Sequence, residues 1–577
     1  MSSPFGCIRA KCVRAISGRK ALVEENKSTW WRDAVIYQVY PRSFADSNGD
    51  GVGDLEGIRS RIPYLKDLGI DAIWLTPFYT SPQVDHGYDV ADFMNVDSLF
   101  GDLSDFDRLM SDAKAANIRV IVDIVPNHSS DQHDWFQSAL KSTPGSRERA
   151  RYLFRDGKGE HGELPPNNWK SVFGGPAWTR IREQDGTLGQ WYLHLFAPGQ
   201  PDFDWENPEV HQYFETVLKF WLDRGVDGFR IDVAAGMVKA HGLPDQEGEE
   251  GAKLLEYKPQ PMWDQDGVHD IFRHWRKILD SYPGQRMAVS EAWIGSAERM
   301  ARYVRPDEMM QTFNFDFLGT KWNLADMKAT ITKSIEAVRE VGAPPSWVIN
   351  NHDVARSVDR YDRDLNPGGG TTRERYGDPK KVNLIRGQRR ARAGALLMFA
   401  LPGGCYMFEG EELALPDVQD IPDDRRQDPV WTQSNHLDVG RDGCRVPIPW
   451  TISAAGAFGF SNRTDLTPDQ AWLPQPAGWG RFSVQAQQND STSSLEMYRK
   501  ALKIRKAHDD LGEGDLKFIS LGKNLLAIFR GKSFLSITNF GRWRKKIPAG
   551  YVLLHSSAPL ERGKIPTDTT VWLQREK

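Results

Sequence analysis

Short apolar runs rich in β-branched residues alternate with longer stretches of helical periodicity along most of this chain. Eight such runs follow one another from about residue 34 onward: 35-VIYQVY-40, 72-AIWL-75, 118-IRVIVDIV-125, 225-GVDGFRIDV-233, 287-MAVSEAW-293, 311-QTFNFDF-317, 346-SWVIN-350 and 404-GCYMF-408. Strands that alternate with helices predict parallel βαβ units, and eight units in sequence predict an α/β TIM (β/α)8 barrel. The alternative is a doubly wound open sheet, but no glycine-rich phosphate loop follows the first run.

The stretches between these runs have the spacing of amphipathic helices. The two clearest are 103-LSDFDRLMSDAKAAN-117 and 209-EVHQYFETVLKFWLDRG-225. In the second, apolar residues recur every three or four positions, as on a buried helix face. These residues are Val210, Tyr213, Phe214, Val217, Leu218 and Trp221.

One connection is far too long for an ordinary barrel loop. The third predicted strand ends near Val125, whereas the fourth begins near Gly225. The interior of this gap is rich in Gly, Pro, Asn and Trp, as in 165-PPNNWKSVFGGPAW-178. We therefore expect an irregular domain, residues 128–200, inserted between two barrel segments, residues 30–127 and 201–512.

The chain changes character after a last helical stretch, 494-SLEMYRKALKIRKAHDDLG-512. Short apolar runs then alternate with turns: 517-KFISLG-522, 525-LLAIFRG-531, 534-FLSITNF-540 and 551-YVLLHSS-557. Several short strands without intervening helices predict an antiparallel arrangement. We expect residues 513–577 to form a C-terminal antiparallel β-sandwich.

Composition narrows the classes of partner and compartment. The net charge of −4 over 577 residues gives no reason to expect a nucleic acid or an anionic membrane as partner. The four cysteines, at positions 7, 12, 405 and 444, form no CxxC pair, which fits a reducing compartment such as the cytoplasm. No apolar run approaches the roughly 18 residues of a membrane span. Residues 1–29 are basic but lack the apolar core of a secretory signal, so we expect a disordered or non-native-like tail.

Acidic residues stand at the ends of four predicted strands: Asp123, Asp232, Glu291 and Asp353. In a parallel barrel, functional side chains gather where the strands end. Taken singly, each of these acids is better explained by a helix cap or an ion pair. Four of them at one mouth of a barrel favour catalysis, because two carboxylates that flank a glycosidic bond are the minimal machinery of a glycosidase.

Neighbouring residues refine these candidates. Arg230 stands two residues before Asp232 on one strand, so both side chains face the same way, and its charge is expected to keep that carboxylate ionised. Glu291 lies beside Trp293 at an apolar strand end, a setting that suits a general acid. His128 and His352 lie close to these acids in sequence and are candidate hydrogen-bonding groups. No HExxH or GxSxG motif is present.

The loop 46-DSNGDGVGD-54 has the oxygen spacing of a hard-cation site. Its candidate ligands are Asp46, Asn48, Asp50, the Val52 carbonyl and Asp54. An EF-hand is excluded, because the position that needs a bidentate glutamate holds Gly57. A solvated turn explains the same composition equally well.

Together, these residues resemble a known family. The segments 123-DIVPNH-128, 228-GFRIDV-233, 290-SEAW-293 and 350-NNHD-353 resemble, in order, the four short motifs of the alpha-amylase family (glycoside hydrolase family 13). Three further segments are similar to the alpha-glucosidase and oligo-1,6-glucosidase branch: 35-VIYQVYPRSF-44, 85-DHGYDVADF-93 and 440-GRDGCRVPIPW-450. The resemblance runs from about Trp30 to the end of the chain.

The resemblance implies a role for each residue. Asp232 would be the nucleophile of a retaining reaction, Glu291 the acid/base, and Asp353 the group that binds the 2- and 3-hydroxyls of the first glucose unit. His128, Arg230 and His352 would line the same subsite. Tyr88 would stack under the sugar, and Asp89 with Arg445 would close the pocket, so that only a chain end fits. The loop at residues 46–54 would hold a structural Ca²⁺ or Mg²⁺, and no organic cofactor would be needed.

The resemblance predicts an exo-acting alpha-glucosidase that releases glucose from short alpha-glucosides, as a monomer or small homo-oligomer. Val233 after the nucleophile is typical of α-1,6 specificity, but other segments are closer to maltose-cleaving relatives, so the linkage stays open. A glucosyl transferase or isomerase, such as a trehalose synthase or sucrose isomerase, is the alternative. A non-catalytic transporter heavy chain is disfavoured, because such chains carry a membrane span and lose catalytic acids.

Overall fold

The computed structural model describes residues 29–247, 260–363 and 383–576. The predicted N-terminal tail therefore lies outside the described residues, except for Thr29. The prediction of a TIM barrel is confirmed: eight parallel strands form one sheet in the order β11-β10-β9-β5-β2-β1-β13-β12. They are β1 (Val35–Val39), β2 (Ala72–Leu75), β5 (Arg119–Ile124), β9 (Gly228–Ile231), β10 (Met287–Ser290), β11 (Gln311–Thr312), β12 (Ser346–Val348) and β13 (Gly404–Phe408).

The barrel is nearly closed, with its seam between β11 and β12. There the hydroxyl of Ser346 donates a hydrogen bond to the carbonyl of Thr312. The predicted strand at residues 311–317 is wrong in its second half, because β11 ends at Thr312. Asn314 then accepts a hydrogen bond from the Phe317 amide at 3.0 Å and starts helix α10 (Phe315–Gly319). An N-cap side chain thus overrides the aromatic strand pattern.

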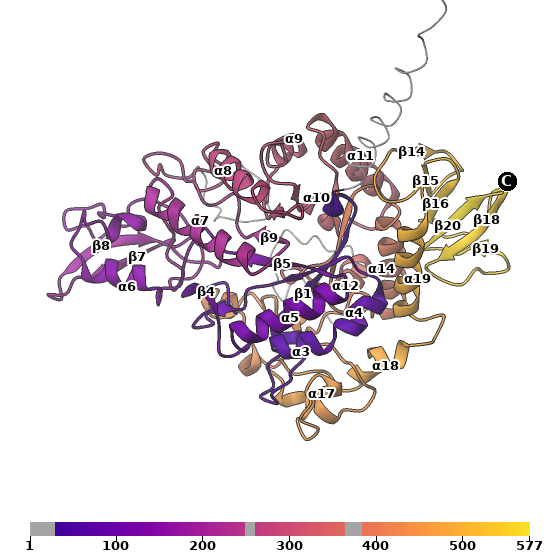
Figure 1. Cartoon of the computed structure of the whole chain (residues 1–577), viewed down its shortest axis with the longest axis horizontal. Helices are drawn as coiled ribbons and strands as arrows, with labels where there is room; N and C mark the ends of the chain where they lie inside the picture. Colours follow the sequence, from indigo (N-terminus) through magenta and orange to yellow (C-terminus); the bar gives the residue numbers. More distant parts are fainter. Residues whose placement is uncertain (1–28, 248–259, 364–382, 577) are drawn as a thin grey trace, which may run out of the picture.

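Helices cover the outside of the barrel (Figure 1). The longer ones are α5 (Leu103–Ala115), α7 (Pro208–Asp223), α8 (Val268–Asp280), α11 (Leu324–Glu340), α14 (Leu384–Met398) and α19 (Ser494–Ala507). The shorter ones are α2 (Pro41–Phe44), α3 (Leu55–Ser60), α4 (Ile62–Leu68), α6 (Asp134–Lys141), α9 (Ala297–Arg302), α12 (Ser357–Arg363), α15 (Pro429–Gln433), α16 (Asp442–Arg445), α17 (Ala455–Gly459) and α18 (Val484–Gln487). None of the helices in the described ranges is long and apolar enough to cross a membrane.

Helix α7 shows why these segments fold as they do. Asn207 caps its first turn by accepting from the Glu209 amide at 2.9 Å, and Pro208 occupies the first helical position. The predicted apolar face is buried except for the half-buried Tyr213. Trp221 on this face also donates to the Phe93 carbonyl at 2.9 Å, which satisfies its indole N–H inside the core.

The segment between β5 and α7 projects from the barrel, at the opposite end of the molecule from the C-terminal sheet (Figure 1). It holds α6 and a three-stranded antiparallel sheet of β6 (Phe154–Arg155), β8 (Leu188–Leu193) and β7 (Trp178–Arg182). Its own apolar cluster includes Trp169, Phe173 and Trp178. Val233, two residues after β9, packs into the same cluster and so ties the projecting segment to the barrel mouth.

The C-terminal region is antiparallel, as predicted. Five strands pair in the order β14-β15-β16-β20-β18, and β17 pairs with β19 in a second, two-stranded layer. Their bounds are β14 (Leu516–Ile519), β15 (Leu525–Arg530), β16 (Phe534–Asn539), β17 (Lys545–Lys546), β18 (Tyr551–Ser556), β19 (Lys564–Ile565) and β20 (Thr569–Arg575). Ile565 of the small layer packs in one cluster with Leu535 and Leu573 of the larger sheet. The sequence analysis missed β20, which lies between β16 and β18.

Arg530 joins this sheet to the barrel. It is buried and donates to the carbonyls of Ala400 at 2.7 Å, Gly512 at 2.9 Å and Asp515 at 3.0 Å. These acceptors belong to connecting segments, so removal of the buried guanidinium takes one hydrogen-bond donor from each of them.

We predict that Arg530→Met lowers thermal stability by about 2–4 kcal/mol, because a buried polar network loses its donor. Thermal unfolding followed by circular dichroism measures the change. Lys532→Met is the matched control, since Lys532 is exposed in the next turn. Equal melting temperatures for the two variants would contradict the role of Arg530.

Candidate active site

The acids singled out in the sequence lie at the carboxyl end of the barrel. Asp232 directly follows β9, Glu291 directly follows β10, and Asp353 lies five residues beyond β12. Asp123 is the penultimate residue of β5, the strand that pairs with β9. Parallel strands bring their ends to one rim, so four segments far apart in the sequence contribute to one site.

Arg230 lies at the centre of these acids. Its Nη1 is 2.8 Å from Asp123 Oδ1 and also contacts Asp232, and its Nη2 is 2.6 Å from Glu291 Oε2. The guanidinium is only 2% exposed, so these interactions act almost without water. One positive charge therefore holds three carboxylates together, and the group keeps an excess of negative charge.

The expectation that Arg230 lowers the pKa of Asp232 and keeps it ionised needs correction. Burial, helped by the neighbouring carboxylates of Glu291 and Asp123, raises the pKa of Asp232 well above its ordinary value, against the pull of Arg230. The sequence shows that Arg230 stands two residues before Asp232. It does not show that Asp123 and Glu291 contact the same guanidinium.

Asp123 is the deepest of the four acids. Burial raises its pKa to about 7, and its carboxylate accepts from Trp74 Nε1 at 3.2 Å and Tyr88 OH at 3.3 Å. The residue is fully buried, whereas the Asp353 side chain is 21% exposed. Asp123 is therefore placed to position Arg230 and Tyr88 rather than to contact a substrate.

Asp353 has a different electrostatic environment. Its carboxylate contacts Arg441 Nη1 at 3.1 Å and Arg445 Nη2 at 3.2 Å. Burial favours its protonated form, yet the positive charges around it hold the pKa of Asp353 below its ordinary range. Because burial also lowers the pKa of His352, that positive charge comes from three arginines, Arg441, Arg445 and Arg230. Asp353 thus stays ionised.

Tyr88 and His352 form a stacked pair beside Asp353. Their ring centroids are 5.3 Å apart with nearly parallel planes, and Tyr88 OH lies 2.6 Å from His352 Nε2. The amide nitrogen of Gln38, 2.6 Å from His352 Nδ1, can only donate, so the neutral ring carries its proton on Nε2. That nitrogen also faces Asp353 Oδ2 at 3.3 Å. The Tyr88 hydroxyl is therefore held at the edge of the His352 ring, close to Asp353.

The expected pair of Asp89 and Arg445 does not form. Asp89 accepts from the backbone amides of Val84 at 2.7 Å and Asp85 at 2.9 Å, and burial raises its pKa to about 6. Arg445 instead donates to the His352 carbonyl at 2.8 Å and to Asp353. Asp89 is thus a structural acceptor that shapes its own loop.

The ion pair at this place joins Asp85 and Arg441, with Arg441 Nη2 2.9 Å from Asp85 Oδ1. Asp85 lies in the loop between β3 (Tyr79–Thr80) and β4 (Asp92–Val96). Arg441 also contacts Asp428 at 2.8 Å and packs over the Phe173 ring of the projecting segment. Both residues were missed, although each lies four positions before a residue that was named.

His128 lies at the base of the projecting segment. Its Nε2 is 3.2 Å from the Tyr88 carbonyl, and Asn127 Nδ2 is 3.1 Å from its Nδ1. Burial lowers the pKa of His128 to about 4, so the ring is neutral near pH 7. In this arrangement His128 fixes the Tyr88 loop.

Lys239 forms a buried link that the sequence analysis did not identify. Its ammonium lies 2.7 Å from Asp202 Oδ2, 2.9 Å from Asn127 Oδ1 and 2.6 Å from the Gly236 carbonyl. Asp202 ends the projecting segment, whereas Gly236 lies in the loop that follows Asp232. A single cation thus fastens the projecting segment to the loop after Asp232.

The loop at residues 46–54 uses its oxygens to cap its own backbone. Asp46 accepts from the amides of Gly49 at 2.6 Å and Gly51 at 3.0 Å, and Asp54 accepts from Ser47 at 2.8 Å. Asn48 and Asp50 accept from the amides two residues on. Within the described ranges, no group of three or more His, Cys, Asp or Glu side chains is gathered in a metal-binding arrangement. This is the geometry of the turn alternative, and the Ca²⁺ or Mg²⁺ site stays a prediction.

Comparison with known proteins places this arrangement in a family. The model of the alpha amylase catalytic domain matches residues 38–514. The chain is 34% identical to an oligo-1,6-glucosidase of Parageobacillus thermoglucosidasius, covering 85% of this chain and 86% of that one. It is 35% identical to a probable alpha-glucosidase of Rhizobium meliloti, covering 88% of each. The solved structure of the alpha-glucosyl transfer enzyme XgtA superposes with a TM-score of 0.80 at 32% identity, covering 95% of this chain and 100% of that one.

We predict that Lys239→Met destabilises the protein by about 3–5 kcal/mol, because the buried Asp202 carboxylate keeps its hydrogen bonds from Asn127 and Leu195 but loses its counter-charge. Thermal unfolding gives the loss, and limited proteolysis reports whether cleavage starts in the projecting segment. The double variant Lys239→Met with Asp202→Asn removes both charges and is expected to recover part of the stability. Additive losses in the double variant would show that the two groups do not interact.

Proposed function

Because the chain belongs to the alpha-amylase family and is a glycoside hydrolase of its alpha-glucosidase branch, we propose that it is a retaining, exo-acting alpha-glucosidase. Its substrates would be short alpha-glucosides, from whose non-reducing ends it would release glucose. The observation that carries the proposal is the pair of carboxylates, Asp232 and Glu291, held on one buried guanidinium. Two acids bound to the same group lie close together, which favours the retaining spacing of about 5 Å over the wider inverting one.

Each acid has a distinct proposed role. The Asp232 carboxylate would attack the anomeric carbon and form a covalent glucosyl-enzyme, while Glu291 protonates the departing glycosidic oxygen. Glu291 would then take a proton from water, which attacks the same carbon and releases glucose. Its Oε2 accepts from the Val233 amide at 3.1 Å and its Oε1 from Trp293 Nε1 at 3.2 Å, so the acid is held from both sides.

Asp353 would bind the hydroxyls of the first glucose unit. Its ionised state supports this role, because a carboxylate accepts strong hydrogen bonds from sugar hydroxyls. Arg441 connects Asp353 to Asp85 across the same end of the barrel. This bridge supports an exo mode of action, since a crosslink there would block a chain that continues beyond its terminal unit.

Glucosyl transfer is the second candidate. The alpha-glucosyl transfer enzyme XgtA matches 95% of this chain over its whole length. Both reactions share the chemistry up to the glucosyl-enzyme and differ only in whether water or a sugar accepts the glucosyl group. Val233 has a φ of 45°, in the left-handed region, and packs against the projecting segment. Val233 would influence whether α-1,4 or α-1,6 linkages are preferred, and product analysis distinguishes the two.

We predict that purified protein releases glucose from maltose or isomaltose and that Asp232→Asn lowers turnover by at least about a thousandfold, because the nucleophile is lost. Free glucose and new disaccharides are measured with maltose, isomaltose and sucrose supplied separately. Circular dichroism confirms that the variant is folded. New disaccharide with little free glucose would establish transfer, and normal turnover by the variant would reject Asp232 as nucleophile.

The raised pKa of Asp232 also predicts a pH dependence. The nucleophile must be ionised, and it gains its proton at a higher pH than an ordinary aspartate does. Activity is therefore expected to fall as the pH drops through that raised pKa, with the acid limb of kcat/KM well above pH ~4. A pH profile with buffers of constant ionic strength measures this limb. Full activity down to about pH 4 would contradict the environment described for Asp232.

A further inference from the structure

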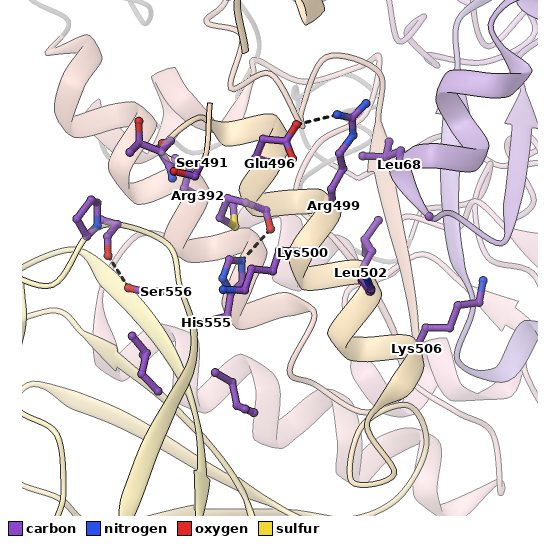
Figure 2. A pocket seen from close by; sticks show the side chains of 18 of the residues that line it. Leu68, Arg392, Ser491, Glu496, Arg499, Lys500, Leu502, Lys506, His555 and Ser556 are labelled. Carbon is purple, nitrogen blue, oxygen red and sulfur yellow. Dashed lines mark hydrogen bonds and ion pairs between the residues drawn. The ribbon is translucent and has the colours of Figure 1, made fainter. Parts of the chain in front are cut away.

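A second cavity lies away from the acids, between the barrel and the C-terminal sheet. Its volume is about 880 Å³, and its walls come from the end of α4, from α14 and α19, and from β18 with the loop after it. Figure 2 shows α19 running through the site, with the strands of the C-terminal sheet on one side and Leu68 on the other. Gly69 in its wall precedes β2, so the cavity opens at the amino end of the strands, opposite the candidate active site.

The lining of this cavity is strongly basic, although the whole chain carries a net charge of −4. Six cationic side chains face two acidic ones, Asp67 and Glu496. The cationic side chains are Lys66, Arg392, Arg499, Lys500, Lys503 and Lys506. A concave surface with such an excess of positive charge attracts anions.

Asp67 and Glu496 already form ion pairs. Arg499 contacts both, at 2.7 Å from Asp67 Oδ2 and 2.7 Å from Glu496 Oε1. Lys506 pairs outside the cavity with Asp71 at 2.6 Å. The remaining cations, Lys66, Lys500, Lys503 and Arg392, make no ion pair with any described residue.

Arg392 carries the strongest argument. Its one hydrogen bond within the described residues runs from Nη1 to the Thr492 carbonyl at 2.9 Å, and its Nε is buried without a partner. Burial lowers the pKa of Arg392, and Tyr498 and Asp490 oppose that shift. A bound anion would accept from the terminal nitrogens of Arg392, because guanidinium groups bind phosphate through two parallel hydrogen bonds.

The rest of the wall indicates more than a bare ion. The hydroxyl groups of Ser491, Thr492 and Ser556 lie in the lining, together with the apolar side chains of Met497, Leu553, Leu554 and Leu560. Lys500 lies beside His555, whose Nε2 is 2.9 Å from the Met497 carbonyl (Figure 2). The volume is within the range of small-molecule sites and far exceeds that of one phosphate ion.

We propose that this cavity binds a small organic phosphate of about nucleotide size, with its phosphate on Arg392 and Lys500 and its organic part over the apolar wall. The ligand contacts both α19 of the barrel region and β18 of the C-terminal sheet. Its binding therefore stabilises the junction between them. The site is separate from the catalytic acids and does not take the glucoside substrate.

Calorimetric titration of the full chain tests this proposal, with adenosine monophosphate, inorganic phosphate and adenosine as probes at one ionic strength. We expect adenosine monophosphate to bind more tightly than inorganic phosphate, and adenosine to show no binding. Arg392→Gln with Lys500→Gln is expected to weaken the binding of adenosine monophosphate at least about tenfold, because charge-assisted hydrogen bonds are lost. Maltose or isomaltose hydrolysis should be unchanged in this variant.

Two further variants keep the test decisive. The double variant Lys500→Gln with Lys503→Gln alters only exposed residues. It replaces the first variant in the titration if the Arg392 change impairs folding. Lys523→Gln with Lys532→Gln removes the same charge outside the cavity and should bind as the unmodified protein does. Absence of binding by both phosphates, or equal binding by all variants, would overturn the proposal. Equal affinity for inorganic phosphate and adenosine monophosphate would overturn the claim that the apolar wall binds the organic part of the ligand.

Discussion

The sharing of one buried guanidinium among three carboxylates is the constraint on which the barrel mouth depends. Arg230 faces Asp123, Asp232 and Glu291 from the interior of a nearly closed sheet, where an unpaired charge would cost several kcal/mol. Removal of any one partner therefore changes the ionisation of the others. Strands β5, β9 and β10 must keep their register for this contact to exist. The candidate catalytic acids and the arginine in the barrel core are consequently one electrostatic unit.

The projecting segment depends on the same rim through different contacts. Lys239 fastens Asp202 to the loop after Asp232, Phe173 packs under Arg441, and His128 supports the Tyr88 loop. None of these side chains is expected to react. They fix the distance between the projecting segment and the acids, which sets the shape of any substrate that enters between them.

The sequence predicted the barrel well, because hydrophobic runs such as those of β5 and β13 are buried on both faces and short connections restrict their order. Sequence patterns predicted the structure less well where a helix cap or a contact between distant residues determines the local conformation. Asn314, for example, caps helix α10 and so ends the predicted strand early. The candidate acids were found because each follows an apolar strand. Asp85, Arg441 and Lys239 were missed, since their partners are distant in sequence and the contacts exist only once the loops have folded.

The left-handed backbone conformation of Val233 connects the position of Glu291 with the type of residue that position 233 can hold. A β-branched residue with φ of 45° carries a local cost of about 1–3 kcal/mol, yet this conformation directs the Val233 amide toward Glu291. The side chain recovers part of that cost by packing into the apolar cluster of the projecting segment. Glycine or asparagine would relax the backbone but give up that packing. A substitution of Val233 therefore changes two properties at once: how firmly the backbone holds Glu291, and the shape of the wall that the projecting segment presents beside it.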